Sequence, residues 1–115
     1  MKLKQVSEIL DAKTLTAAPW EEIEVESACG CDLMSDVLAF VKNHALLLTG
    51  LVNPQVIRTA EMMDIKTIVF VRGKEPQAPV LELAEDMGIT VMTTKYPLYS
   101  ACGKLYQNGL GGRGE

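Results

Sequence analysis

The apolar residues of the chain follow two periods, and these periods predict its strands and helices. Residues 45–48 and 68–71 are continuous apolar runs without alternation, which is typical of strands covered on both faces in a parallel sheet. The apolar residues between them recur at helical spacing and mark one face of a helix: Val56, Ile57, Ala60 and Met63. Residues 45–71 are therefore predicted to form a strand, a helix and a second strand.

The start of this central helix is marked by residues that favour such a position. Asn53 is a preferred helix cap, and Pro54 stands at the first helical position, where proline is tolerated. The connection is long enough to join two parallel strands by a crossover, which would be right-handed.

The rest of the chain divides in the same way. Helical spacing predicts helices over residues 3–10, 33–41, 79–87 and 97–105, and apolar or alternating segments predict strands over 13–16, 23–29 and 89–93. Asp32 is expected to cap the helix that follows it. The predicted fold class is α/β with a small, mostly parallel sheet. One domain is expected over residues 1–108, followed by a flexible glycine-rich tail over residues 109–115.

Polar residues follow three of the predicted strands, each at its carboxyl end. In chain order they are Thr49, Gly50, Asn53, Arg72, Gly73, Thr93 and Thr94. Because parallel strands end at the same edge of a sheet, we expect these residues to form the walls of one site for a nucleotide or another phosphorylated anion. The alternative is that Gly50 only permits a tight turn and Asn53 only caps the helix.

Composition and charge narrow the classes of partner. The net charge of −4 argues against nucleic acid, whose phosphates normally require a basic patch. No apolar run approaches the roughly 20 residues of a membrane-spanning helix. The first residues alternate polar with apolar positions and lack the apolar block of a signal peptide, so a cytoplasmic protein is expected. Three cysteines, an odd number, fit a reducing compartment.

The cysteines allow two interpretations. Cys29, Cys31 and Cys102 would supply three thiolates for a metal or a redox centre if the fold joined them. Cys29 and Cys102 fall in the apolar phase of their segments, however, where cysteine is a small core residue, and Cys31 alone is expected to be accessible. His44 is the only histidine, so no nucleophile, base and oxyanion site can be assembled into a catalytic set.

One apolar residue does not fit the central helix. Met62 lies away from the face made by its other apolar residues, so it is expected to be exposed. It is either a contact in a homodimer or a single apolar surface residue of the common kind.

Residues 33–94 resemble the DRTGG domain in the order and spacing of their markers. These are a strand ending in Leu-Thr-Gly at 48–50, a helix, a strand ending in Val-Arg-Gly at 71–73, a helix, and a strand ending in Thr93 and Thr94. With the preceding segment the resemblance covers residues 3–105. The chain departs from the pattern after Gly50, where relatives tend to have Gly-Asp-Arg-Thr and this chain has Gly-Leu-Val-Asn.

The resemblance implies a three-layer α/β/α fold, similar to the N-terminal domain of HPr kinase/phosphorylase and to the module between the CBS domains of regulated pyrophosphatases. In those proteins the domain is accessory to catalysis, and the regulatory region of the pyrophosphatases responds to adenine nucleotides. Free-standing relatives are often encoded beside iron-hydrogenase subunits.

We therefore expect a non-catalytic regulatory or assembly module without a cofactor. It would sense a nucleotide or another phosphorylated anion, and it would act as a homodimer or on a partner enzyme, with a hydrogenase as one candidate. The alternative function is a metal or redox accessory protein that uses Cys29, Cys31 and Cys102.

Overall fold

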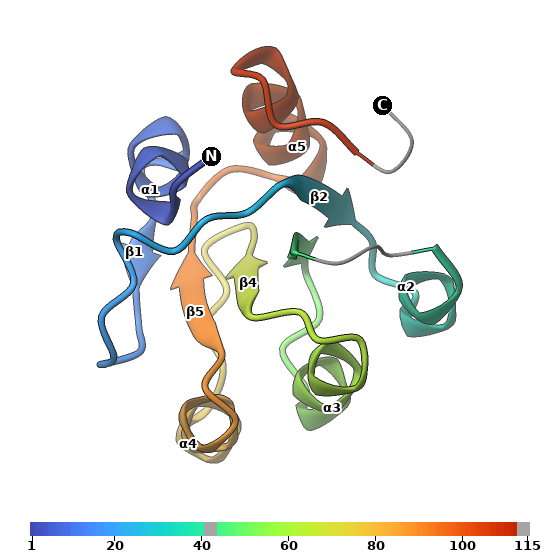
Figure 1. Ribbon diagram of the computed structural model, residues 1–115. Helices are drawn as coiled ribbons and strands as arrows, with labels where there is room; N and C mark the ends of the chain where they lie inside the picture. Colours follow the sequence, from blue (N-terminus) through green and yellow to red (C-terminus); the bar gives the residue numbers. More distant parts are fainter. Residues whose placement is uncertain (41–43, 113–115) are drawn as a thin grey trace.

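Four parallel strands form the centre of the molecule, and a short fifth strand runs antiparallel at one edge. The computed structural model describes residues 1–40 and 44–112 (Figure 1). The strands are β1 (Lys13–Thr14), β2 (Ser27–Gly30), β3 (Ala45–Thr49), β4 (Thr67–Phe70) and β5 (Thr90–Thr93). Their order in the sheet is β1-β5-β4-β3-β2, with only the β1–β5 pair antiparallel. The predicted α/β class with a mostly parallel sheet is confirmed.

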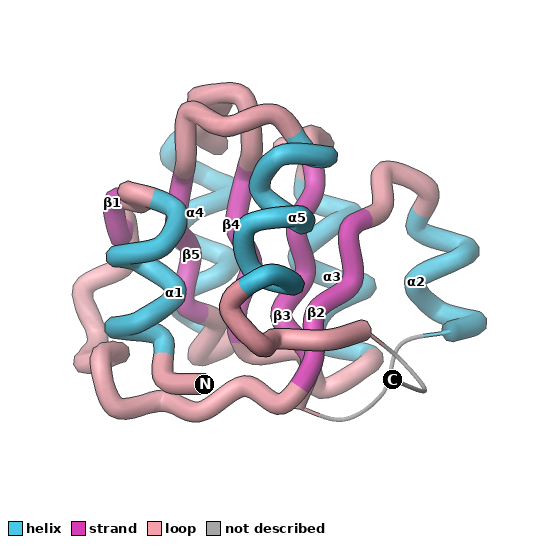
Figure 2. The backbone as a smooth tube through the Cα atoms, turned by 90° about the horizontal axis from the view of Figure 1, so that it is seen from above, coloured by secondary structure: helices cyan, strands magenta, loops and turns pink. Residues whose placement is uncertain are grey.

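Five helices cover the two faces of this sheet. They are α1 (Leu3–Leu10), α2 (Met34–Phe40), α3 (Pro54–Met62), α4 (Ala78–Asp86) and α5 (Leu98–Gln107). Helices α2, α3 and α4 lie on one face and α1 and α5 on the other, which gives three layers (Figures 1 and 2). None of the helices in the described ranges has both the length and the apolar character needed to cross a membrane.

The central strands are buried on both faces, as their continuous apolar sequences predict. Leu46, Leu48 and Val69 belong to the core beneath α1 and α5, whereas Leu47 and Ile68 belong to the core beneath α2, α3 and α4. Side chains alternate between the faces of a strand, so a strand with helices on both sides needs apolar residues at every position.

The helix boundaries follow local chemistry. The Asn53 side chain accepts a hydrogen bond from the Val56 N–H at 3.3 Å, and Pro54 opens α3, so both predictions for this helix start are confirmed. Helix α4 ends before Gly88, whose φ of +70° is a left-handed conformation that glycine adopts without strain. The predicted end of the second helix at residue 41 lies outside the described residues.

The segment before β2 pairs differently from the predicted strand over 23–29. The Leu3 N–H donates to the Ile23 carbonyl at 2.8 Å, and the Val25 N–H donates to the Met1 carbonyl at 2.9 Å. The first residues of the chain therefore take the backbone groups of this segment, and regular pairing with β3 begins only at Ser27. The predicted start of this strand at residue 23 was wrong. Residues 23–25 bond to the first residues of the chain, and a sequence pattern does not show such a distant partner.

The glycine-rich end begins as a packed segment. Leu110 is only 3 % exposed, and the Ala28 N–H donates to the Gly111 carbonyl at 3.0 Å. Strand β2 is an edge strand, and the end of the chain satisfies one of its outward N–H groups. Of the segment expected to be a flexible tail from residue 109, Leu110 and Gly111 contact the domain, and residues 113–115 lie outside the described ranges.

Candidate functional site

The sheet brings the turns after β3, β4 and β5 to one edge. Thr49 is in register with Phe70, and Phe70 is in register with Thr93. The loop after β4 is tied to the loop after β5, because the Arg72 N–H donates to the Tyr96 carbonyl at 2.9 Å and the Gly73 N–H donates to the Thr94 carbonyl at 2.8 Å. The residues predicted to form one site therefore do lie along one edge.

The turn after β3 holds a carboxylate of the chain itself. Asp32 follows β2, and its Oδ1 accepts hydrogen bonds from the Gly50 N–H at 2.7 Å and from the Thr49 hydroxyl at 2.9 Å. These bonds lower the pKa of Asp32, with the Gly50 N–H as the largest cause, and nearby Arg72 and Lys74 add to the effect. Asp32 is an exposed side chain and remains a carboxylate at neutral pH.

Asp32 therefore has a different role from the predicted one. The carbonyl of Leu33 accepts the N–H groups of Asp36 and Val37 at the start of α2, while the Asp32 side chain points to the neighbouring strand end. The prediction of a cap was wrong because the free N–H of Gly50 is a competing donor that the local sequence does not reveal. The position of Asp32 soon after a parallel strand was the feature of the sequence that could have indicated a contact with the neighbouring strand end.

Two cationic side chains flank Gly50. Lys74 Nζ donates to the Gly50 carbonyl at 3.0 Å, and a Cβ atom placed on Gly50 would lie 2.7 Å from Arg72 Nη2. Among the described residues neither cation forms an ion pair within 4.0 Å. Arg72 and Gly73 both have left-handed backbone conformations, with φ of +59° and +68°, which bend the loop back over the strand end. Lys74 is not among the predicted site residues, although the run Arg-Gly-Lys directly after a predicted strand stands in the sequence.

The threonines of the predicted site are buried below its exposed residues. The Thr93 hydroxyl donates to the Lys74 carbonyl at 2.7 Å, and the Thr94 hydroxyl donates to the Leu10 carbonyl at 2.7 Å. Both residues are buried, at 8 % and 2 % exposed. Together with Thr49, whose hydroxyl bonds Asp32, they hold the loops in place and leave the exposed surface to Asn53, Arg72, Gly73 and Lys74.

A cleft opens beside these residues, between the start of α3 and the start of α4. It has a volume of about 490 Å³ and is lined by Gly50, Leu51, Val52, Asn53, Pro54, Lys74, Gln77, Pro79 and Val80. The Lys74 ammonium and the amino ends of two helices give the cleft a positive character, which suits an anionic ligand.

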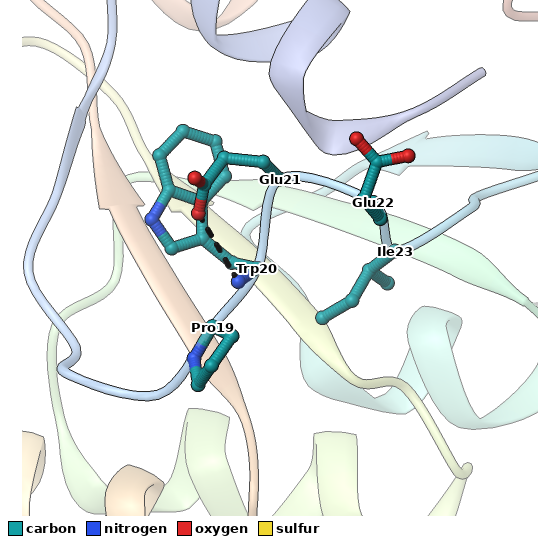
Figure 3. A pocket seen from close by; sticks show the side chains of 5 residues that line it. All are labelled: Pro19, Trp20, Glu21, Glu22 and Ile23. Atoms are coloured by element: carbon teal, nitrogen blue, oxygen red, sulfur yellow. Dashed lines mark hydrogen bonds between the residues drawn. The ribbon is translucent and has the colours of Figure 1, made fainter.

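A second cavity, of about 390 Å³, has a much simpler lining. Its walls all come from one loop, Pro19, Trp20, Glu21, Glu22 and Ile23 (Figure 3). Glu21 Oε1 accepts the Trp20 N–H at 3.5 Å, and Glu22 bonds Lys2 Nζ at 2.7 Å, which raises the pKa of Lys2 and lowers that of Glu22. Because Glu22 is already paired with Lys2 and a single loop lines this cavity, the carboxyl edge of the sheet is the better candidate site.

The fold separates the cysteines. Cys29 and Cys31 pack against the core beneath α2, α3 and α4, whereas Cys102 packs against the core on the opposite face. No group of three metal-ligating side chains was found within the described part of the chain. All three cysteines are half-buried, so the prediction that Cys31 alone is accessible was wrong. The reason is that β2, which carries Cys29, lies at the sheet edge and is incompletely covered, although burial still raises the pKa of Cys29 and of Cys102.

The predicted exposure of Met62 is confirmed. Its side chain is 69 % exposed at the end of α3, away from the buried face of that helix.

Comparisons with known proteins define the class to which this fold belongs. No protein-family model and no curated protein matches the chain. Among solved structures it resembles the CBS and DRTGG domains of the regulatory region of the Clostridium perfringens pyrophosphatase, in complex with the activator diadenosine tetraphosphate. The TM-score is 0.70 and the identity 15 %, over 92 % of this chain and 46 % of that chain. The chain spans about half the length of that structure. The fold is DRTGG-like, as the sequence resemblance predicts.

Proposed function

We propose that this chain is a non-catalytic regulatory module that binds the phosphate groups of an adenine nucleotide at the carboxyl edge of its sheet. The observation that carries the proposal is the pair of cations, Arg72 and Lys74, that lie beside Gly50 and an open cleft and form no ion pair with any other described residue. Unpaired cations next to backbone N–H groups are the usual partners of phosphate oxygens.

The fold supports a regulatory role. The solved structure that it resembles is the regulatory region of a larger enzyme, and that region binds a nucleotide activator. The chain spans about half of that region, so the nucleotide is carried over here as a hypothesis about the ligand class.

The absence of enzyme activity is part of the proposal. His44, the only histidine, stands before β3, at the end of the strand opposite Asp32 and Gly50. A general base at one end of the strands cannot reach an anion bound at the other, since a strand of five residues spans about 16 Å.

Ligand binding is tested by thermal unfolding of the full chain with ATP, ADP, AMP and diadenosine tetraphosphate. A ligand that binds only the folded state must raise the melting temperature, and at ten times its Kd it adds about 1.4 kcal/mol to the unfolding free energy. We expect Lys74→Ala, Arg72→Ala and Asn53→Ala each to reduce the ligand-induced shift. Lys66→Ala is the matched control, since it removes a lysine that pairs with Asp64 at the other end of the sheet. No shift of the wild type at millimolar nucleotide would reject the proposal.

We propose that the module contacts either a second copy of the chain or a partner enzyme. Met62 is the candidate contact, because it is a large apolar side chain that is 69 % exposed on α3. Light scattering of wild type and Met62→Lys distinguishes the two cases. If wild type is a dimer and the variant is a monomer, a homodimer through α3 is supported. If both proteins are monomers, the partner enzyme remains as the proposed contact.

A further inference from the structure

The chain places its own carboxylate where an anionic ligand would sit. Asp32 Oδ1 takes the Gly50 N–H at 2.7 Å and the Thr49 hydroxyl at 2.9 Å. These two donors belong to the strand-to-helix turn that would otherwise be free to bind a phosphate oxygen. An incoming anion would therefore meet a group of the same charge, which already accepts the hydrogen bonds of the Gly50 N–H and the Thr49 hydroxyl.

The same carboxylate is positioned so that it can be replaced. Asp32 is exposed, and no ion pair between it and Arg72 is found among the described residues, although a Cβ on Gly50 would lie 2.7 Å from Arg72 Nη2 and 3.5 Å from Asp32 Oδ2. A ligand with several phosphate oxygens would contact Arg72 and Lys74 and offer a new acceptor for the Gly50 N–H. Cations that attract the ligand and a carboxylate that repels it thus converge on one residue.

Asp32 is also the connection between this turn and α2. The helix begins at Met34, two residues after Asp32, and like most helices of globular proteins it depends on packing for its stability. It is attached to the core through Met34 and Val37, while Leu33 and Leu38 are 58 % and 42 % exposed. The hydrogen bonds that Asp32 accepts from the Gly50 N–H and the Thr49 hydroxyl therefore hold the segment that leads into α2.

We propose that Asp32 is an internal competitor of the anionic ligand, and that its displacement from Gly50 loosens α2. This inference rests on the proposed function, since it concerns the same site. Ligand binding at the strand ends would thereby change the exposed surface of α2, which lies at the opposite edge of the sheet from β1 (Figure 1). A regulatory module needs such a link between its ligand and a surface that a partner can detect.

The competition is tested with inorganic tripolyphosphate and ATP by isothermal titration calorimetry. Asp32→Ala removes both the charge and the acceptor, and we expect it to bind tripolyphosphate about tenfold more tightly than wild type or better. Asp32→Asn keeps an oxygen for the Gly50 N–H and removes only the charge, so an intermediate affinity is expected. Asp36→Ala is the control, because it makes the same change of charge one helical turn further along α2.

The link to α2 is tested by hydrogen exchange of its backbone amides. Without ligand, Asp32→Ala should exchange faster than wild type and Asp36→Ala across residues 34–40, and Asp32→Asn should remain close to wild type. Saturating tripolyphosphate should accelerate the same amides in wild type and leave Asp32→Ala unchanged.

Three results separate the inference from the function on which it rests. If wild type binds ATP and Asp32→Ala binds no more tightly than Asp36→Ala, the competition is refuted and the proposed function stands. If affinity rises but exchange in α2 does not respond to ligand, the link to α2 is refuted. If neither wild type nor any variant binds ATP or tripolyphosphate, the proposed function itself is rejected.

Discussion

The hydroxyl of Thr94 donates a hydrogen bond of 2.7 Å to the carbonyl of Leu10, and so joins two residues 84 positions apart. The same oxygen accepts the Tyr96 N–H at 3.3 Å. Thr94 is 2 % exposed, so water cannot replace either bond. This contact fixes the end of α1 to the loop after β5, and through it the first helix to the candidate site.

We predict that Thr94→Val destabilises the fold by about 1–3 kcal/mol, because valine keeps the shape of threonine but leaves the buried Leu10 carbonyl and the partly buried Tyr96 N–H without this partner. Urea denaturation gives the change in the free energy of unfolding. A loss below about 0.5 kcal/mol would mean that the Leu10 carbonyl finds another donor.

Thr67 provides the matched comparison within the same sheet. It is fully buried in β4, and its hydroxyl has no hydrogen-bond partner among the residues that the structure describes. Thr67→Val should therefore leave the unfolding free energy unchanged or raise it by up to about 1 kcal/mol, since it removes an unpaired polar group from the core. Opposite signs for the same substitution at Thr67 and Thr94 would show that hydrogen bonding decides the effect and not the loss of a hydroxyl as such.

The second prediction concerns the approach of Arg72 to Gly50. A Cβ on Gly50 would lie 2.7 Å from Arg72 Nη2, so Gly50→Ala must push the guanidinium aside. We expect a change in stability within about 1 kcal/mol, because the end of an arginine side chain moves easily. Affinity for ATP should fall about tenfold, because the cation is displaced from the site. Unchanged affinity in calorimetry would mean that Arg72 does not contact the ligand.

Gly103→Ala is the control for that substitution. Gly103 lies within α5 and is exposed, and apart from its own helix no described residue has an atom within 4 Å of the place where a Cβ would be. Alanine there should raise the unfolding free energy by about 0.5–1 kcal/mol through helix propensity alone, with no effect on ATP binding.

Much of the fold was predictable from the sequence because its signals are local. The period of apolar residues and the Asn53-Pro54 cap depend on neighbours a few positions away, and they marked the α3 boundary correctly. The hydrogen bond that the Gly50 N–H donates to Asp32 and the one that Lys74 donates to the Gly50 carbonyl depend on which strands lie side by side. Periodicity does not encode strand order, so these contacts became visible only with the sheet assembled.

The same distinction explains which parts of the candidate site were predicted. That the residues after three strands share one edge follows from parallel strand direction alone. Which of them face outward depends on long-range partners, such as the Leu10 carbonyl that engages Thr94 and the Lys74 carbonyl that engages Thr93. The sequence pattern does not indicate which of these residues are buried. In the structure the loops bury the threonines and leave Arg72 exposed.

The third prediction is a pH dependence that Asp32 causes. The pKa of Asp32 in the folded state is lowered from its ordinary value of 3.8, with the Gly50 N–H as the largest cause. The folded state therefore binds this proton more weakly than the unfolded state does, so the stabilisation is fully present above the ordinary pKa and is lost as the pH falls through the lowered one. The difference in unfolding free energy between wild type and Asp32→Asn should be constant near neutral pH and should shrink below about pH 4. A difference that stays constant down to about pH 2 would contradict the role of this carboxylate.

The fourth prediction tests how closely α5 approaches the edge strand β2. A Cβ on Gly30 would collide with the Sγ atom of Cys102, and neither a strand backbone nor a short cysteine side chain moves easily. Gly30→Ala should therefore cost about 1–3 kcal/mol of unfolding free energy through overpacking. Cys102→Ala removes the colliding sulfur, so the double variant should be more stable than the sum of the two single losses predicts, by about 1 kcal/mol or more. Additive losses would show that glycine is needed at position 30 for its backbone and not for the close packing of Cys102.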